Sequence, residues 1–311
     1  MPKPLGAHPD RVAMRATLRR RIAAIEQTAR HPAESPGGAA LPFGVGAIDR
    51  HLPWGGLAGA GVHEITQNTD GASGTAFVAC LLGLLQRGKM APRPVLWVAP
   101  RQPRHETLYG PGLSALGFDP FDARAGLVLV RARGIKQILW AVEEGLREAQ
   151  VGAVVAEIPA QAAPDLTASR RLQLAAEAGG TLGVLLRTER MRGALFPSAC
   201  MSRWRVAPTP PPDEGTLFSE SPCWRVELLR CRGASPGAWI LEWQKQETHQ
   251  ERPYGNEPQH QTRAAVKAAA RTTYGFRLVA PLRDRPDLPT PRRFAETRQR
   301  PHEGPHANVA G

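Results

Sequence analysis

The sequence has few cysteines and no hydrophobic run long enough to cross a membrane. Its cysteines form no C-x-x-C pair, which argues against a disulfide framework or a zinc site, so we expect no metal: Cys80, Cys200, Cys223 and Cys231. The N-terminus, MPKPLGAHPD, lacks the apolar segment of a signal peptide. The longest apolar stretch, around residues 76–85, has roughly half the length that a membrane-spanning helix needs. We therefore expect a cytoplasmic protein without a membrane segment.

The composition is that of a folded, basic protein. The chain has 311 residues, of which 42% are hydrophobic, enough to bury a substantial core. Lysine and arginine number 40 and aspartate and glutamate 28, which gives a formal net charge of +12. This charge favours polyanionic partners such as nucleic acid or acidic protein surfaces. An arginine-rich proteome would give the same balance, so both interpretations stay open.

Residues 1–40 are expected to form an amphipathic helix and a linker. Within residues 10–29, arginines alternate with apolar residues at helical spacing: Met14, Leu18, Ile22 and Ile25. The stretch that follows, RHPAESPGGAA, is rich in Pro, Gly and Ala and indicates a linker. A helix on such a tether either folds back on its own domain or docks on a neighbour.

Residues 41–245 are expected to form an α/β domain with a mostly parallel sheet and helices on both faces. Apolar strand candidates alternate with helix-like segments: GVHEI, RPVLWVA, GLVLVRA, GAVVAEI and TLGVLLR. Further along, CWRVELLRCRG and GAWILEWQ indicate an antiparallel extension of the sheet. Residues 246–311 are Pro-rich and charged, so we expect a largely disordered tail. Within it, residues 272–282 are an apolar island that could order on a partner.

The segment LPFGVGAIDRHLPWGGLAGAGVHEIT resembles the start of the core of RecA-family recombinases. The likeness extends through the β/α repeats to about residue 243. Together with the basic N-terminal helix and the two closing strands, the chain resembles the ImuA family, RecA-like accessory factors of bacterial mutagenesis cassettes. The resemblance implies a RecA-like core whose first loop, between GVHEI and TAFVACLLGLLQ, lies where RecA proteins hold the phosphates of ATP.

The loop QNTDGASGT lacks the lysine of a phosphate loop, G-x-x-x-x-G-K-[ST]. With Gly74 as the second glycine, Thr75 takes the lysine position; counted from the preceding strand, Ser73 takes it. Asp70, next to Gly71, adds a negative charge where phosphates would sit. The loop can instead cap the following helix, because Asp70, Ser73 and Thr75 carry oxygens that accept its first N–H groups.

Other catalytic positions of the RecA-like core also differ. Pro100 and Arg101 follow the second strand, where the resemblance implies a general-base glutamate. Glu157 is the only match to the magnesium-orienting acid, and it can equally cap a strand end or pair with an arginine. Arg187 stands near the γ-phosphate sensor position. We therefore expect no ATPase activity, no enzymatic function and no cofactor.

A second candidate site is a basic segment that corresponds to a DNA-contacting loop of RecA proteins. Its arginines are interleaved with aromatic residues, a composition that suits backbone contacts and base stacking on single-stranded DNA: Arg187, Arg190, Arg192, Phe196, Arg203, Trp204 and Arg205. A solvated basic strand edge has the same composition, and this alternative stays open.

The resemblance implies a non-catalytic accessory factor of damage-induced (SOS), error-prone translesion DNA synthesis. The partners it implies are RecA, the ImuB-type Y-family polymerase homologue and the error-prone replicative-type polymerase subunit. Two alternatives stay open. One is a weak DNA-dependent ATPase in which Thr75 binds magnesium and Arg101 replaces the lysine. The other is a cell-division inhibitor of the SulA type, which shares the RecA-like ancestry.

Overall fold

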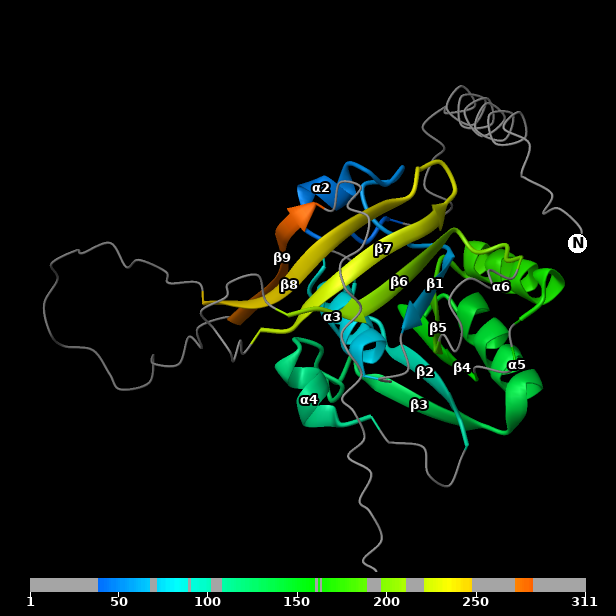
Figure 1. Ribbon diagram of the computed structural model, residues 1–311. Coiled ribbons are helices and arrows are strands. Elements are labelled where there is room, and N and C mark those ends of the chain that lie inside the picture. Colours follow the sequence, from blue (N-terminus) through cyan, green and yellow to red (C-terminus); the bar gives the residue numbers. More distant parts are fainter. Residues whose placement is uncertain are drawn as a thin grey trace, which may run out of the picture.

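A computed structural model gives the arrangement of residues 39–67, 72–88, 91–101, 108–159, 162, 164–188, 197–210, 221–247 and 272–281. In this described part of the chain, nine strands form one sheet in the order β3-β2-β4-β5-β1-β6-β7-β8-β9 (Figure 1). The predicted N-terminal helix and its linker lie outside the described residues, apart from residues 39 and 40.

One half of the sheet is parallel. Neighbouring strands run in the same direction from β3 through β2, β4, β5 and β1 to β6. Their bounds are β1 Val62–Gln67, β2 Val95–Pro100, β3 Leu127–Ala132, β4 Ala153–Ile158, β5 Leu182–Thr188 and β6 Ser202–Pro208. Three of these, β2, β4 and β5, are largely apolar on both faces, as buried parallel strands require, whereas β1 also buries His63, Glu64 and Gln67. The predicted α/β fold with a mostly parallel sheet is confirmed.

The other half is antiparallel. β7 (Cys223–Cys231), β8 (Gly237–Glu247) and β9 (Thr272–Pro281) follow β6 in succession. The expected pair β7–β8 is therefore present. The expectation of a disordered tail from residue 246 is wrong for residues 272–281, because this segment pairs with β8 of its own chain. Phe276 on β9 packs on Trp243 and Phe77, with ring centroids 4.7 and 5.3 Å apart, which explains why the apolar island joins the sheet.

Helices cover both faces of the parallel half, as predicted (Figure 1). α2 (Gly46–Asp49), α3 (Ser73–Arg87) and α4 (Gly110–Ala115) share one apolar core, and α5 (Gly134–Arg147) and α6 (Leu166–Gly179) share the other. Asp165 caps α6 by accepting a hydrogen bond from the N–H of Ala168, at 2.7 Å. No described helix is both long enough and apolar enough to span a membrane.

The two apolar cores are of unequal size. The larger one, on the α3 side, continues under the antiparallel strands and contains every buried Phe and Trp side chain of the described residues: Phe43, Phe77, Trp97, Phe118, Trp204, Trp224, Trp239, Trp243 and Phe276. The smaller one is aliphatic and lies between the sheet and the pair α5–α6, with Val62, Val98 and Ile138 among its members. Alternation along β1 explains the division, since Ile65 faces the first core and Val62 the second.

The glycines of GGLAGAG let the segment before β1 pack closely. Leu41 and Leu57 form an antiparallel bridge with backbone hydrogen bonds of 2.8 Å in both directions. A Cβ atom at Gly56 would lie 2.3 Å from the carbonyl oxygen of Leu41, and one at Gly59 would lie 2.0 Å from that of Ala39. Only glycine permits this contact, which holds the first described residues against the start of β1.

Candidate functional site

The carboxyl ends of the parallel strands are where ligands bind in open α/β sheets, so the loop between β1 and α3 is the first candidate site. β1 ends at Gln67, and α3 begins at Ser73. Asp70 and Gly71 lie outside the described residues. The site is therefore built here from the two ends of the loop and from the neighbouring strand ends.

The first turn of α3 is not capped in the way the sequence suggested. Ala72 occupies the N-cap position, and its methyl side chain cannot accept a hydrogen bond. Ser73 and Thr75 lie inside the first helical turn, so the prediction that they form the N-cap is wrong. Instead, Gln67 reaches across from the end of β1, and its Oε1 accepts a hydrogen bond from the backbone N–H of Gly74, at 2.8 Å.

Gln67 fills the space beneath the start of α3. Its side chain is 6% exposed, and its Nε2 also makes a longer contact, 3.5 Å, with Oγ1 of Thr188 at the end of β5. A Cβ atom at Gly74 would lie 2.5 Å from Oε1 of Gln67, so the two residues fit closely. N–H groups at helix N-termini bind phosphate in nucleotide-binding proteins. Here the N–H of Gly74 has a partner within the chain.

Glu157, near the end of β4, is hydrogen-bonded to a core tryptophan. Nε1 of the fully buried Trp97 donates to Oε1 of Glu157 at 2.7 Å. The sequence had suggested a strand-end or arginine-paired role for this carboxylate, and it gave no signal for the indole partner. At the end of β2, the backbone N–H of Arg101 donates to the carbonyl of Ala132, and its side chain is exposed.

Trp204 is the clearest correction to the candidate DNA-binding segment. Its side chain is 1% exposed and packs on Phe43, with ring centroids 5.5 Å apart, so it cannot stack on a base in this arrangement. The sequence made it a candidate for base stacking, but its position on β6 directs it into the aromatic core. Its Nε1 donates to Oγ of Ser202 at 2.6 Å.

Ser202 continues this hydrogen-bond chain to His63. Oγ of Ser202 lies 2.6 Å from Nδ1 of His63, and Nε2 of His63 lies 3.0 Å from the carbonyl oxygen of Ala58. A carbonyl only accepts, so Nε2 carries the proton and Nδ1 accepts from the serine hydroxyl. Burial lowers the pKa of His63 to about 4, which keeps the ring neutral. The hydrogen bonds of Trp204, Ser202, His63 and Ala58 thus form a network within the core.

Arg203 is also buried, and the expectation that it contacts DNA is therefore wrong. Its Nε donates to Oε2 of Glu64 on β1 at 2.5 Å, and both side chains are almost inaccessible. Removing a paired arginine from a buried carboxylate would leave an uncompensated charge. The thiol of Cys200 lies 3.8 Å from the same carboxylate, and burial followed by the Glu64 charge raises the pKa of Cys200 to about 12.

Of the other arginines in this segment, Arg187 and Arg205 belong to the described part of the chain. Arg205 pairs with Glu227 on β7 at 3.1 Å, and Glu227 also pairs with Arg225 at 2.6 Å. Arg187 lies partly buried near the end of β5. Arg190, Arg192 and Phe196 lie outside the described residues, as do the helix residues Met14, Leu18, Ile22 and Ile25. Of the predicted DNA contacts, the structure contradicts Trp204 and Arg203, and the others stay predictions: Arg187, Arg190, Arg192, Phe196 and Arg205.

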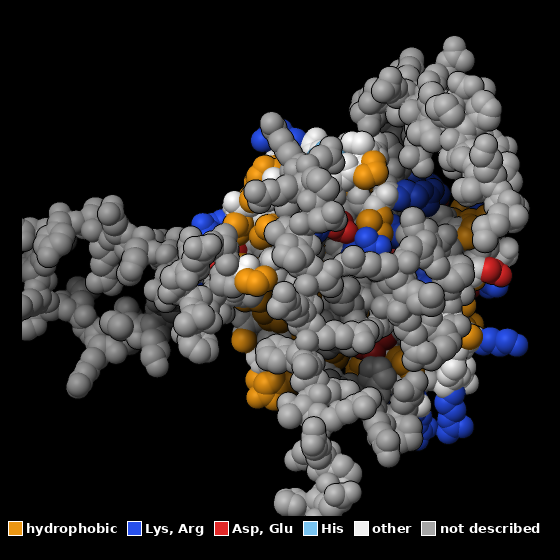
Figure 2. Space-filling model, viewed as in Figure 1, with side chains coloured by type: hydrophobic (Ala, Val, Ile, Leu, Met, Phe, Trp, Pro, Cys, Tyr) orange, Lys and Arg blue, Asp and Glu red, His pale blue; other side chains and the backbone are white. Residues whose placement is uncertain are grey.

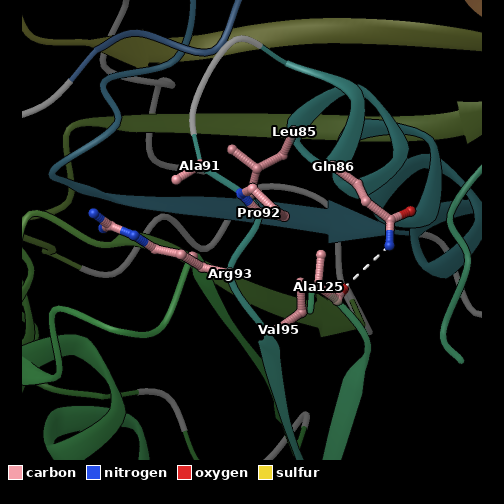
Figure 3. A pocket seen from close by; sticks show the side chains of 8 residues that line it. Leu85, Gln86, Ala91, Pro92, Arg93, Val95 and Ala125 are labelled. Atoms are coloured by element: carbon pink, nitrogen blue, oxygen red, sulfur yellow. Dashed lines mark hydrogen bonds between the residues drawn. The ribbon is translucent and has the colours of Figure 1, made fainter. Parts of the chain in front are cut away.

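A small cavity lies at the other end of the strands, beside the amino ends of β2 and β4 (Figure 3). It is lined by Leu85, Gln86, Ala91, Pro92, Arg93, Val95, Ala125 and Gly152. Its volume of about 20 Å³ leaves room for roughly one water molecule. Nε2 of Gln86 closes one side by donating to the carbonyl of Ala125 at 3.1 Å. Among the described residues, no group of His, Cys, Asp and Glu side chains could hold a metal ion.

Comparison with known proteins gives a specific likeness. No protein-family model matches the chain. Two curated proteins do match, each named Protein ImuA and each from a strain of Caulobacter vibrioides. Both are 44% identical to the chain over an alignment of 220 residues that covers 66% of this chain and 84% of each relative.

Proposed function

The chain belongs to the ImuA family, and from this premise we propose that it is a non-catalytic, RecA-like accessory factor of damage-induced (SOS), error-prone translesion DNA synthesis. It works by binding other proteins in the cytoplasm. Its partners are RecA, the ImuB-type Y-family polymerase homologue and the error-prone replicative-type polymerase subunit. The observation that carries the non-catalytic part of this proposal is the hydrogen bond between Gln67 and Gly74.

That hydrogen bond and the missing lysine both argue against nucleotide chemistry. A phosphate at the start of α3 would have to displace Oε1 of Gln67 from the N–H of Gly74. The lysine that would compensate is missing, and a charge-assisted hydrogen bond to phosphate contributes roughly 1.5–3 kcal/mol. Loss of the lysine therefore weakens nucleotide binding by about ten- to a hundredfold. Hydrolysis suffers more, because the same cation stabilises charge that develops in the transition state.

Glu157 supports the same conclusion. In a working site this position holds magnesium, whereas here one carboxylate oxygen accepts a hydrogen bond from Trp97. An indole N–H only donates, so the bond engages an acceptor that a magnesium-bound water would otherwise use. With Pro100 and Arg101 in place of a general base and Arg187 near the sensor position, the chain lacks the lysine, the base and the sensor at once.

Nucleotide binding and turnover by the full chain test the non-catalytic proposal. We expect neither saturable ATP binding nor hydrolysis above background, with or without single-stranded DNA. RecA, assayed under the same conditions, is the positive control. Saturable hydrolysis that disappears in Thr75→Ala would overturn the proposal and favour the ATPase alternative. A pull-down from damaged cells, scored for the tubulin-like division protein against the polymerases, separates the proposal from a SulA-type role.

The docking of the N-terminal helix on RecA is tested separately. We propose that Met14, Leu18, Ile22 and Ile25 make this contact, because they share one face of the predicted helix. In the full chain, Leu18→Glu with Ile22→Glu should abolish RecA binding, whereas Arg15→Gln should preserve most of it. Unchanged RecA binding after deletion of residues 1–30 would exclude this contact while leaving the polymerase partners in place.

A further inference from the structure

The strands β2 and β3 and the first part of α5 contain basic residues and no acidic ones. Residues 91–101 and 123–142 cover these elements and include neither Asp nor Glu, whereas their basic residues are Arg93, Arg101, Arg124, Arg131, Arg133 and Lys136. Lysine and arginine side chains stand out at the lower right of Figure 2, where β2 and β3 end and α5 begins in Figure 1. This region is therefore a local source of positive potential.

Three of these residues lie together at the carboxyl ends of the two strands. Pro100 of β2 pairs with Ala132 of β3, and the backbone N–H of Arg101 donates to the carbonyl of Ala132 at 2.8 Å. Arg101 and Arg133, the next residue of each strand, therefore leave the sheet side by side. Lys136 follows Arg133 by three residues, about one turn of helix. We call Arg101, Arg133 and Lys136 the basic cluster; all three are exposed.

The fold places the basic cluster where positive charge is unfavourable. Arg101 and Arg133 are neighbouring like charges, which repel each other. The N-terminus of α5 is the positive end of the helix dipole, yet its first turn contains Lys136 and no acid. A bound polyanion would remove each of these repulsions, as the phosphates of a nucleic acid do when they meet lysine and arginine.

Acids of the adjoining elements do not neutralise the basic cluster. Glu157 near the end of β4 and Asp165 at the start of α6 each accept a hydrogen bond within the fold. Further along α5, Glu143 and Glu144 pair with Arg147. Among the described residues, no carboxylate lies within ion-pair distance of the basic cluster.

An exposed tryptophan adjoins the basic cluster. Trp140 follows Lys136 by four residues, so the two lie on one face of α5. The indole-bearing residue is 65% exposed, while the helix uses Ile138, Val142 and Leu146 for the core. Proteins that bind single-stranded nucleic acid combine basic residues along the backbone with aromatic side chains on which bases stack. The basic cluster and Trp140 supply both parts.

We propose that the basic cluster and Trp140 bind single-stranded nucleic acid, with phosphates on the cluster and a base on the indole ring. A duplex keeps its bases stacked inside and offers Trp140 no partner. An acidic peptide would meet the charges without a planar group for the ring. The site is separate from the DNA-contacting segment predicted from the sequence, which begins at Arg187 on β5. It goes beyond the proposed function, which concerns contacts with proteins.

Fluorescence anisotropy of the purified full chain with labelled oligothymidine tests the site. We expect Arg101→Gln with Arg133→Gln to weaken binding at least about tenfold and to lower the slope of log affinity against log salt by about 1.4, since each phosphate contact on a single strand contributes about 0.7. Trp140→Ala should weaken binding about tenfold. The matched controls, Arg124→Gln and Phe121→Ala, change exposed residues near the opposite end of β3 and should bind as the unmodified chain does.

Competitors identify the class of ligand. Oligouridine should displace the probe, because it has the same backbone charge and stackable bases, whereas duplex DNA and polyglutamate should displace it only at higher concentration. Unchanged binding in the Arg101 and Arg133 double variant or in Trp140→Ala, with thermal unfolding showing folded protein, would overturn the inference. Equal displacement by polyglutamate or by duplex DNA would overturn it too. The assay contains no partner protein, so its outcome is independent of the protein contacts proposed above.

Discussion

At the residue scale, buried polar groups make the stability of this protein depend on pH. Burial lowers the pKa of His63 to about 4 in the folded state, against 6.5 for an exposed histidine. Between these values the unfolded chain binds more protons than the folded one, so stability is full above pH 6.5 and is lost as the pH falls toward 4. We expect His63 to account for a loss of about 2 kcal/mol between pH 7 and pH 5, measured by urea unfolding.

His63→Gln separates this effect from the carboxylates, which also titrate at low pH. The variant loses the bond to Ser202 and is expected to be less stable at pH 7. Its free energy of unfolding should nevertheless fall less between pH 7 and pH 5 than that of the unmodified chain. Parallel pH profiles for the two proteins would show that His63 does not carry the titration.

Gln67 has a stabilising role that can be measured apart from any nucleotide. Gln67→Met keeps the volume of the side chain and removes the acceptor, which leaves the buried N–H of Gly74 unpaired. We expect the free energy of unfolding to fall by about 1–3 kcal/mol. The matched control is Gln137→Met, because Oε1 of Gln137 accepts from the N–H of Arg133 at an exposed position where water can replace it. An equal loss in both variants would contradict the buried role of Gln67.

At the scale of elements, β9 is part of the folded domain. Phe276 is nearly buried among Phe43, Phe77, Trp224 and Trp243. We expect Phe276→Ala to lower the free energy of unfolding by about 3–5 kcal/mol. Phe121→Ala, at an exposed position, should change it by less than about 0.5 kcal/mol.

A pair of truncations tests the same strand without a point substitution. Chains 1–271 and 1–281 both lack the residues after β9 and differ only by β9 itself. The shorter chain exposes Trp243 and the open edge of β8, so we expect a lower Tm and a tendency to aggregate. Equal Tm values would mean that β9 contributes nothing to the core.

The elements that the sequence predicted correctly are those whose pattern is local. A parallel strand buried on both faces is a short apolar run, and β2, β4 and β5 all show it. β6 was missed as a strand because Arg203 and Arg205 interrupt its apolar residues, and only the fold supplies their partners on β1 and β7. β9 was missed because its partner β8 precedes it by more than twenty residues of polar sequence.

For the candidate sites too, the sequence predicted the local features correctly and missed those that depend on contacts distant in sequence. The missing lysine could be read directly from the loop, because a motif is a property of neighbouring residues. The bond from Gln67 to Gly74, the indole partner of Glu157 and the burial of Trp204 depend on side-chain direction and on contacts distant in sequence. Composition alone made Trp204 resemble a base-stacking residue, and only the alternation of β6 reveals that it faces the core.

At the scale of the whole molecule, one sheet joins a parallel half to an antiparallel half through β6. The larger aromatic core passes beneath both halves, so they should unfold together. The loop between β1 and α3 and the helices α5 and α6 all belong to the parallel half of the sheet.

The cysteines report on this global cooperativity. Cys231 is partly exposed, whereas Cys80, Cys200 and Cys223 are buried, and burial raises the pKa of each of the three. Since the thiolate is the reactive form, we expect a disulfide-exchange reagent to modify Cys231 quickly and the others only on global unfolding. In Cys231→Ser the fast phase should vanish, and the remaining rates should rise together with urea. A second fast thiol in that variant would mean that one half of the sheet opens independently of the other.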